Sequence, residues 1–353
     1  MRAVSYAAYG QPPTVGELPD PVCPPGGVVV RVLATGVCRS DWHAWLGHDP
    51  VPLPMVPGHE LAGEVAEVGP AVRRWRVGDR VTVPFACGCG DCPVCRAGDT
   101  HVCPRQTQPG FTGWGSFGEL VAIEAADTNL IRLPDSVDVV AAAALGCRYA
   151  TAYRALVGVG RLQAGEWLAV HGCGGVGLSA VQIGVALGAR VVAVDVASAA
   201  RQAALDLGAE VALAAGVGRG VGEQGRGERA ALADLVEATE GGPHLSLDAI
   251  GSVDVLRTSV RSLRPRGRHV QVGLLLRADA VCEVPMGQVI ARELAVLGSH
   301  GMPARDYPEL LDLVDGGRLE PARLVSHVVP LADAPAALMA MAATGLVVVD
   351  PLR

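Results

Sequence analysis

A glycine motif between an expected strand and an expected helix constrains the fold of this 353-residue chain more than any other feature. Gly172, Gly174 and Gly177 form G-x-G-x-x-G directly after the apolar run WLAVH, and the segment 176–187 that follows is typical of a helix. In this setting, glycines permit a tight turn and let the pyrophosphate of a dinucleotide approach the helix N-terminus. Glycines that serve only a turn would need neither neighbour, so the motif predicts a dinucleotide-binding domain.

The end of the next expected strand carries the residue that selects the cofactor. Asp195 stands where a carboxylate can bind the adenosine ribose hydroxyls, and a 2′-phosphate would meet its negative charge. The sequence therefore predicts NAD(H) rather than NADP(H), with Arg201 as the nearby residue that could oppose this preference. We expect seven residues to contact the cofactor: Gly172, Gly174, Gly175, Val176, Gly177, Asp195 and Arg201.

Strand and helix patterns alternate through the second part of the chain. Five short apolar runs predict strands: 167–171, 190–194, 245–250, 269–272 and 294–297. A second helix is expected at 199–207, and the Gly/Arg-rich stretch 216–227 favours a surface loop. This order is typical of a doubly wound, mostly parallel α/β sheet. Earlier Val-rich runs at 27–34, 63–68 and 80–84 instead predict a β-rich, barrel-like domain.

Four cysteines with short spacings predict a structural zinc site in the loop 87–104. They follow the pattern C-x2-C-x2-C-x7-C and are Cys89, Cys92, Cys95 and Cys103. This spacing suits four thiolates around one Zn²⁺, whereas Cys87 fits the pattern less well. Disulfides are an alternative that needs an oxidising compartment, and buried thiols are another. The start MRAVSYAAYG shows no charged segment before an apolar run, which favours a cytoplasmic protein.

Composition limits the class of partner. The net charge is −7 with scattered arginines, and aromatic residues make up 4%, so we expect no nucleic-acid partner. No uncharged apolar run is long enough to span a membrane. A small-molecule partner is therefore expected.

Three further residues form a candidate second metal site. Cys38, His59 and Cys147 make a possible trio, and three protein ligands with an open fourth position are what a catalytic zinc requires. Each has another interpretation, since a lone cysteine is often a small buried hydrophobe and a lone histidine is often hydrogen-bonded in a loop. Glu60, next to His59, could equally be a solvated charge.

Five segments in one order identify a family resemblance. GVCRSDWHAW, GHELAGEVAEVG, the four-cysteine loop, LGCRYATAY and GCGGVG together resemble zinc-dependent alcohol dehydrogenases of the medium-chain dehydrogenase/reductase superfamily. The resemblance implies a β-rich, GroES-like catalytic domain at 1–146 and a Rossmann NAD-binding domain at 147–291. It also implies that the C-terminal segment 292–353 completes the catalytic domain.

The same resemblance implies the chemistry of the second metal site. Cys38, His59 and Cys147 would hold a catalytic zinc that polarises the substrate oxygen during hydride transfer to NAD. Glu60 would coordinate transiently, and Asp41 would hydrogen-bond His59 and fix its tautomer. Proton transfer is expected through two further residues of GVCRSDWHAW, Ser40 as the relay and His43 as the terminal base.

The resemblance also bears on the substrate and on assembly. Phe85, Trp45 and Trp114 fall in or near segments that line the substrate pocket of the family, although each could equally be core or interface. These aromatic residues favour alcohols or aldehydes with a hydrophobic body. The short segment 103–114 is similar to that of microbial tetrameric members, so a homotetramer is favoured over a dimer.

Three functions remain open at this point. The leading prediction is an NAD-dependent zinc alcohol dehydrogenase with two zinc ions per chain. Cys147 supports it, because polyol dehydrogenases commonly place a carboxylate in that position. A polyol or amino-alcohol dehydrogenase would share the zinc chemistry and differ in the pocket. A non-catalytic protein that binds NAD and zinc belongs to another class, and an incomplete ligand set would favour it.

Overall fold

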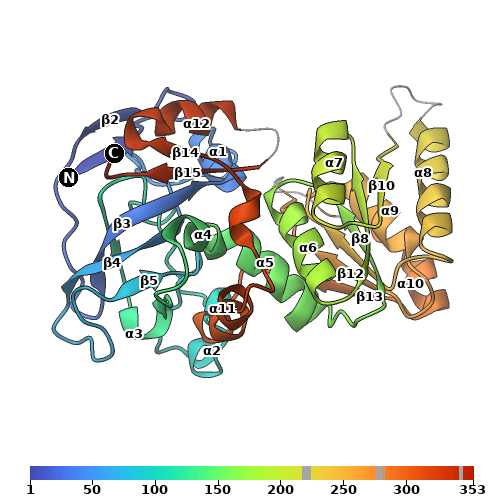
Figure 1. Cartoon of the computed structure of the whole chain (residues 1–353), viewed down its shortest axis with the longest axis horizontal. Coiled ribbons are helices and arrows are strands. Elements are labelled where there is room, and N and C mark those ends of the chain that lie inside the picture. The colour runs from blue at the N-terminus through green and yellow to red at the C-terminus, as the bar shows by residue number, and fades with distance from the viewer. Residues whose placement is uncertain (217–223, 276–280, 282, 342–344) are drawn as a thin grey trace. The chain divides into compact units, whose positions relative to one another are not determined.

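The computed structural model describes residues 1–216, 224–275, 281, 283–341 and 345–353, with only the backbone at 224–228. This part of the chain forms two compact units, one from residues 1–150 and 301–353 and one from residues 151–300 (Figure 1). The expected division at 291–292 falls before strand β13 (Ala295–Gly298), which pairs within the sheet of the second unit. No helix in the described part of the chain has both the length and the apolar character that spanning a bilayer requires.

A mixed sheet organises the first unit. Its strands occur in the order β14-β15-β3-β4-β5-β7, and β6 also pairs with β3. Their bounds are β3 (Val28–Val37), β4 (Glu60–Val68), β5 (Arg80–Thr82), β6 (Leu120–Ile123), β7 (Ile131–Arg132), β14 (Val325–Pro330) and β15 (Leu346–Asp350). Strands β1 (Arg2–Ser5) and β2 (Thr14–Glu17) form a separate antiparallel pair. The expected β-rich domain is confirmed, and β15 brings the end of the chain against β3.

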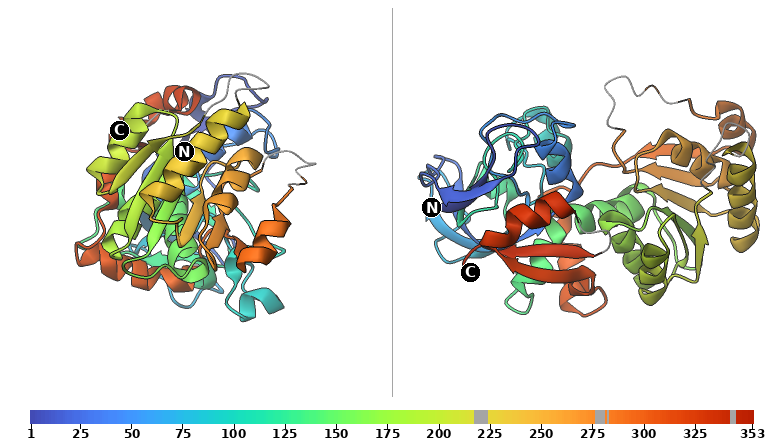
Figure 2. Two further views of the ribbon diagram at one scale, coloured as in Figure 1. Left: turned by 90° about the vertical axis from the view of Figure 1, so that its right-hand side faces the viewer. Right: turned by 90° about the horizontal axis from the view of Figure 1, so that it is seen from above.

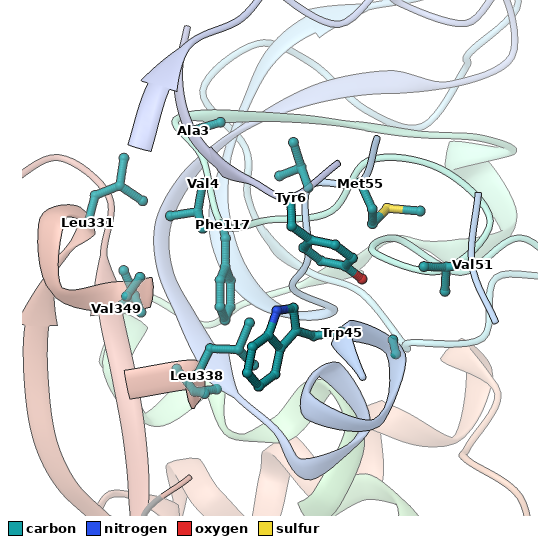
Figure 3. Packing of buried hydrophobic residues seen from close by; sticks show 14 residues of the cluster. Ala3, Val4, Tyr6, Trp45, Val51, Met55, Phe117, Leu331, Leu338 and Val349 are labelled. Atoms are coloured by element: carbon teal, nitrogen blue, oxygen red, sulfur yellow. The ribbon is translucent and has the colours of Figure 1, made fainter. Parts of the chain in front are cut away.

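Two apolar clusters hold this sheet in place. In β3, alternate residues Val28, Val30 and Val32 point into one cluster, as the two-residue period of a strand requires. The other cluster joins the N-terminal segment to the C-terminal one, with Tyr6 and Trp45 packing near Leu338 (Figure 3). Burial of these side chains attaches helix α1 to the sheet.

Short helices connect the strands of the first unit. They are α1 (Arg39–Trp45), α2 (Pro93–Arg96), α3 (Ala126–Asn129), α4 (Val139–Ala143), α11 (Tyr307–Asp315) and α12 (Ala334–Ala340). After α4 the chain enters a π-helical turn, Leu145–Tyr149, which carries Cys147. Such turns occur often at functional sites, since the extra residue redirects the side chains of the helix.

The second unit is built around a parallel sheet with the strand order β10-β9-β8-β11-β12-β13. Its strands are β8 (Trp167–His171), β9 (Arg190–Asp195), β10 (Val211–Ala214), β11 (Leu245–Asp248), β12 (Arg268–Gln271) and β13. Helices α5 (Ala150–Tyr153), α6 (Gly175–Ala186), α7 (Ser198–Asp206), α8 (Gln224–Ala238), α9 (Val253–Ser262) and α10 (Met286–Arg292) connect and flank them (Figure 2). In chain order the strands read 3-2-1-4-5-6, the order of the doubly wound dinucleotide-binding fold, which confirms the expected fold class.

Two of the differences between the expected and the observed boundaries have a local physical reason. The expected loop 216–227 ends early, because α8 begins at Gln224 in a segment rich in Ala, Leu and Glu, which are good helix formers; residues 217–223 lie outside the described part. The strand expected to reach Ile250 ends at Asp248, because the Asp248 carboxylate accepts the backbone N–H groups of Ile250 and Gly251 and turns the chain.

A chain of hydrogen-bonded polar side chains runs through this parallel sheet. We call it the sheet polar chain, and it consists of His171, Ser246, Ser259, His269, Gln271 and Asp248. In that order the bonded atoms lie 3.1, 2.6, 2.7, 3.2 and 3.0 Å apart. Burial lowers the pKa of His171 to about 4 and also lowers the pKa of His269, so both imidazoles are neutral near pH 7.

Candidate functional site

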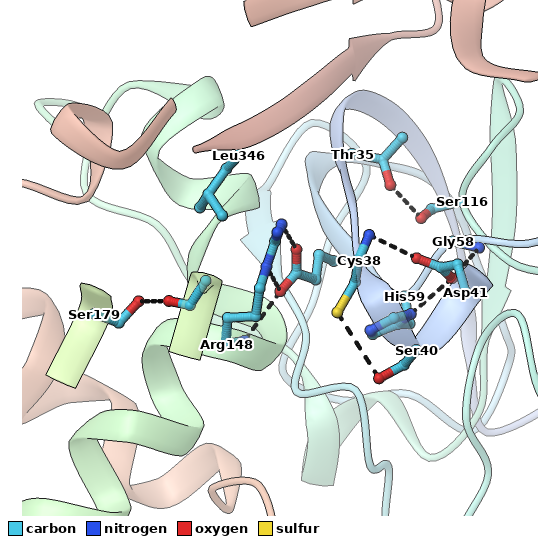
Figure 4. A network of polar contacts seen from close by, with 12 residues as sticks. Thr35, Cys38, Ser40, Asp41, Gly58, His59, Ser116, Arg148, Ser179 and Leu346 are labelled. Carbon is cyan, nitrogen blue, oxygen red and sulfur yellow. Dashed lines mark hydrogen bonds and ion pairs between the residues drawn. The ribbon is translucent and has the colours of Figure 1, made fainter. Parts of the chain in front are cut away.

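One buried carboxylate organises the first candidate metal site. Cys38 precedes helix α1, and Asp41 lies in the first turn of that helix. One Asp41 oxygen accepts the backbone N–H of Cys38 at 3.0 Å, and the other accepts the backbone N–H of Gly58 at 3.0 Å and His59 Nδ1 at 2.9 Å (Figure 4). Since a carboxylate only accepts, the proton of His59 sits on Nδ1, which leaves Nε2 free to bind a metal ion.

Gly58 permits the sharp bend that presents His59. Its φ of +102° lies in the region that favours glycine. A Cβ at this position would stand 2.4 Å from the ring of Phe117 and 2.7 Å from the hydroxyl of Ser116. The motif PGHE therefore needs a glycine here both for its backbone and for its packing.

Four side chains converge in this site. The ligand atoms of Cys38, His59, Glu60 and Cys147 all lie within 4.8 Å of one another. The Cys147 thiol, followed by His59, holds the pKa of Cys38 well below its ordinary value despite burial. Burial lowers the pKa of His59, but Asp41 and Cys38 outweigh it and raise that pKa well above its usual range. Two sulfurs and an imidazole nitrogen are a donor set that suits Zn²⁺.

Glu60 forms a buried ion pair that the sequence analysis missed. Arg148 donates from its backbone N–H at 3.0 Å and from Nε at 2.9 Å to one Glu60 oxygen, and its terminal nitrogen pairs with the other. Burial raises the pKa of Glu60, while the guanidinium of Arg148 opposes this shift. The only available signal was the position of Arg148 directly after Cys147, and that position alone names no partner.

Ser40 and His43 lie on the same side of helix α1. A spacing of three residues makes them neighbours on the helix surface, and Ser40 Oγ is 3.8 Å from Cys38 Sγ. Burial, followed by the nearby charges of His48 and Arg39, lowers the pKa of His43. His43 Nδ1 is 3.1 Å from His48 Nδ1, a contact for which the sequence gave no indication.

The predicted pocket aromatics occupy different environments. The ring of Phe85 lies edge-on to His59 at 6.2 Å, and Phe111, which the sequence analysis did not name, lies edge-on to His59 at 5.2 Å. Trp45 is buried in the apolar cluster and its indole N–H donates to the Gln11 carbonyl, so the structure supports core packing for this residue (Figure 3). Trp114 is partly buried against the same cluster.

The four-cysteine loop has the dimensions of a zinc tetrahedron. Three Sγ–Sγ distances are 3.8 Å for Cys89–Cys95, 3.7 Å for Cys92–Cys103 and 3.5 Å for Cys89–Cys103. Four sulfurs about 2.3 Å from one zinc ion stand about 3.8 Å apart, whereas a disulfide would need about 2.05 Å. Burial raises the pKa of Cys87 to about 12, so this thiol stays protonated. The chemistry of the loop therefore favours zinc over disulfides.

The glycine motif lies between β8 and α6, as expected. Gly174 is the residue before the first turn of α6, where free backbone N–H groups favour an anion. A Cβ on Gly177 would stand 1.7 Å from the Gly172 carbonyl oxygen, so no larger residue allows the helix to pack this closely on the turn. Gly175 and Val176 form the start of the helix.

Asp195, the last residue of β9, lies beside the glycine motif. Its two oxygens accept the backbone N–H groups of Cys173 at 2.7 Å and Ala197 at 2.8 Å. Arg201 directs its guanidinium to the carbonyl oxygens of Asp195 at 2.9 Å and Val196 at 3.0 Å. These bonds hold the Asp195 carboxylate beside the glycine motif and fix the arginine on the backbone of the same turn.

Two family descriptions match most of the chain. Residues 24–135 match the alcohol dehydrogenase GroES-like domain, and residues 175–316 match the zinc-binding dehydrogenase family. The first match covers most strands of the first unit together with the four-cysteine loop. The second begins inside the glycine motif, at Gly175, and covers helix α6 and the strands of the parallel sheet from β9 onward.

Individual proteins are similar over nearly the whole chain. An alcohol dehydrogenase of Geobacillus stearothermophilus is 31% identical over 91% of this chain and 90% of its own length. The solved structure of alcohol dehydrogenase TADH from Thermus sp. ATN1 is 30% identical, with 99% of each chain covered and a TM-score of 0.89. A structure from Sinorhizobium meliloti 1021, described as a zinc-binding dehydrogenase bound to NADP, is 28% identical, with 99% of each chain covered and a TM-score of 0.84.

Proposed function

Because the chain belongs to the zinc-dependent alcohol dehydrogenases of the medium-chain dehydrogenase/reductase superfamily, we propose that it interconverts alcohols and aldehydes or ketones with NAD(H) as the hydride carrier. The observation that carries this proposal is the convergence of Cys38, His59 and Cys147 in one site, with Asp41 holding two of them. A zinc ion bound by this trio would polarise a substrate oxygen and make the neighbouring hydride easier to transfer.

Residues beside the trio orient its ligands and transfer the proton. Asp41 orients His59 and keeps its Nε2 free, and Ser40 stands beside Cys38 with a hydroxyl that can accept and donate a proton. We assign Ser40 as the relay and His43, on the same face of α1, as the base that receives the proton. The lowered pKa of His43 suits a base that is unprotonated near pH 7.

Glu60 has a role that depends on Arg148. Transient coordination by the Glu60 carboxylate would require it to give up bonds to the Arg148 side chain. We propose that Arg148 holds Glu60 away from the trio for most of the cycle, since charge-assisted hydrogen bonds in a buried place are strong.

The substrate class follows from the surroundings of His59. Phe85 and Phe111 flank its ring, which favours an alcohol with a hydrophobic body over a polyol. A polyol or amino-alcohol dehydrogenase remains the second candidate, because it would use the same zinc chemistry. Comparison of kcat/KM for benzyl alcohol and sorbitol separates the two candidates, and a preference for sorbitol would contradict the first.

We expect the enzyme to prefer NAD over NADP by about 10²-fold in kcat/KM, since a 2′-phosphate would meet the Asp195 carboxylate. Replacing Asp195 by asparagine removes the charge and keeps an oxygen acceptor. The ratio of kcat/KM with NAD to kcat/KM with NADP should therefore decrease. The same change at Asp234, exposed on α8, should leave the ratio unaltered. An NADP preference in the parent protein, the cofactor bound by the similar Sinorhizobium structure, would overturn this assignment.

We expect metal-washed protein to contain two zinc ions per chain, one in the trio and one in the four-cysteine loop. Replacement of Cys92 by serine should remove the loop ion and leave the other, because the two ligand sets share no residue. Elemental analysis of washed protein measures this directly. One ion per chain in the parent, with no reduction of NAD, would favour the non-catalytic zinc- and NAD-binding protein.

We also propose a homotetramer, on the ground of the short segment 103–114. Light scattering tests the assembly, since a chain of 36.3 kDa gives distinct masses for a dimer and a tetramer. A stable dimer would remove the tetramer from the proposal.

A further inference from the structure

His43 contacts a second histidine, His48, to which the proposed reaction has so far given no role. His48 Nδ1 lies 3.1 Å from His43 Nδ1, and the His48 backbone N–H donates to the His43 carbonyl at 2.9 Å. Trp42 meets both rings edge-on, with centroid distances of 5.0 Å to His43 and 5.7 Å to His48. Backbone, tryptophan and ring contacts therefore all hold the two imidazoles together at the end of α1. Of the two, His43 is half-buried and His48 is exposed.

This geometry fixes how the pair can carry protons. A hydrogen bond between two Nδ1 atoms needs one proton, donated by one ring to the bare nitrogen of the other. In the neutral pair, one ring therefore has a bare Nε2 and the other has a protonated Nε2. One added proton goes to the bare Nε2, and the pair then carries a single positive charge with the Nδ1 proton between the rings.

We propose that His48 is a further proton carrier of the reaction, which takes the proton from His43 and passes it to solvent. The inference rests on the proposed function, in which His43 receives the proton of the alcohol. A proton arrives at His43 Nε2, the Nδ1 proton of His43 moves to His48 Nδ1, and His48 Nε2 gives its proton to water or to a buffer base. One proton enters and one leaves, and both rings have then changed tautomer. The first arrangement returns when each ring regains its original tautomer by proton exchange with water. Reduction of an aldehyde would use the same steps in reverse.

The charges near the neutral pair oppose the addition of a second proton. The guanidinium of Arg39 lies 5.2 Å above the Trp42 ring, and together with the second imidazole it opposes a doubly charged pair. Asp49 and the Cys38 thiolate act in the opposite direction and favour one charge. The pair therefore takes up and passes on one proton at a time.

Replacing His48 by phenylalanine tests the proposal, because it keeps a ring beside Trp42 and removes both nitrogens. In the parent, NMR of the His43 Cε1–H group should show a pKa that the nearby His48 ring helps to lower. In His48→Phe, His43 should titrate alone and at higher pH. At low buffer concentration kcat should fall about tenfold, less than a full general base contributes, because water can still reach His43. Rising buffer concentration should restore kcat in the variant and leave the parent unchanged.

The matched control is His327→Phe, which replaces an exposed histidine of β14 in the same unit. Neither the titration of His43 nor the buffer dependence of kcat should change in this variant. An unaltered His43 titration in His48→Phe, or a kcat as independent of buffer as in the parent, would refute the proposal. A parent protein that forms no NADH from any alcohol contradicts the proposed function instead, and the NMR titration still decides whether the two histidines share a proton.

Discussion

Replacement of Cys38 by serine abolishes alcohol-dependent NADH formation, with a loss of at least about 10³-fold in kcat, the equivalent of about 4 kcal/mol of transition-state stabilisation. The reason is local. Cys38 supplies one of the three ligand atoms that converge with His59 and Cys147, and a serine hydroxyl stays protonated near pH 7 and binds zinc poorly. The backbone N–H of residue 38 keeps its bond to Asp41, so the fold should be retained.

NADH absorbance, zinc content and circular dichroism together check this prediction. Zinc content should fall by one ion per chain, with no change in the spectrum of the folded protein. Cys23→Ser is the matched control, because Cys23 is a half-buried thiol in the same unit whose hydrogen bonds go to the backbone carbonyls of Pro24 and Gly27. Substantial activity in Cys38→Ser would show that the trio is not the metal site.

Replacement of Arg148 by methionine lowers the free energy of unfolding by about 3–5 kcal/mol near neutral pH, the cost of leaving a buried charge without its partner. Glu60 is fully buried, and the Arg148 side chain bonds both of its oxygens. Methionine fills a similar volume and supplies no donor. Urea unfolding of the zinc-loaded protein measures the change.

The loss in Arg148→Met should shrink as the pH falls. Burial raises the pKa of Glu60, and removal of Arg148 takes away the charge that opposes this shift. A carboxyl whose folded-state pKa lies above its unfolded value binds protons in the folded state first, so stability decreases as the pH rises through that interval. Unfolding at about pH 5.5 should therefore show a smaller deficit than at about pH 7.5.

Two further variants control this experiment. Arg148→Met combined with Glu60→Gln removes both charges and should recover much of the loss, because no unpaired ion remains. Arg132→Met breaks an exposed ion pair with Asp79 in the same unit and should cost about 1 kcal/mol or less. Equal losses in Arg148→Met and Arg132→Met would mean that burial of the Glu60 pair contributes little.

Local patterns in the sequence were sufficient for some parts of the molecule. The run WLAVH became β8 without any change of bounds, since a buried parallel strand is apolar throughout and a glycine turn ends it. The short cysteine spacings likewise predicted a loop whose sulfurs converge, because only two residues stand between Cys89 and Cys92 and between Cys92 and Cys95, so the local backbone keeps these ligands close.

Contacts between segments that are distant in the chain could not be predicted from local sequence patterns. Arg148 meets Glu60 only because a π-helical turn and β4 come together, and 88 residues separate them in the chain. Trp45 could have been assigned to the buried core from its helical spacing, since it follows Asp41 by one turn and both residues lie on the buried face of α1. The aromatic character of Trp45 instead suggested a pocket, and the same reasoning overlooked Phe111 in its loop.

The sheet polar chain has a fixed direction. The Asp248 carboxylate can only accept, so Gln271 must donate to it through Nε2 and offer its Oε1 to His269 Nε2–H. His269 Nδ1 is then bare and accepts from Ser259, and Ser259 in turn accepts from Ser246. Ser246 has no proton left for His171.

It follows that His171 carries its proton on Nε2 and presents a bare Nδ1. One carboxylate thus dictates the tautomer of an imidazole five hydrogen bonds away, and any single reversal would oblige every member in between to turn. The hydrogen bonds of the sheet polar chain therefore all point in one direction, toward Asp248. Each hydroxyl and each ring in it has a single orientation available.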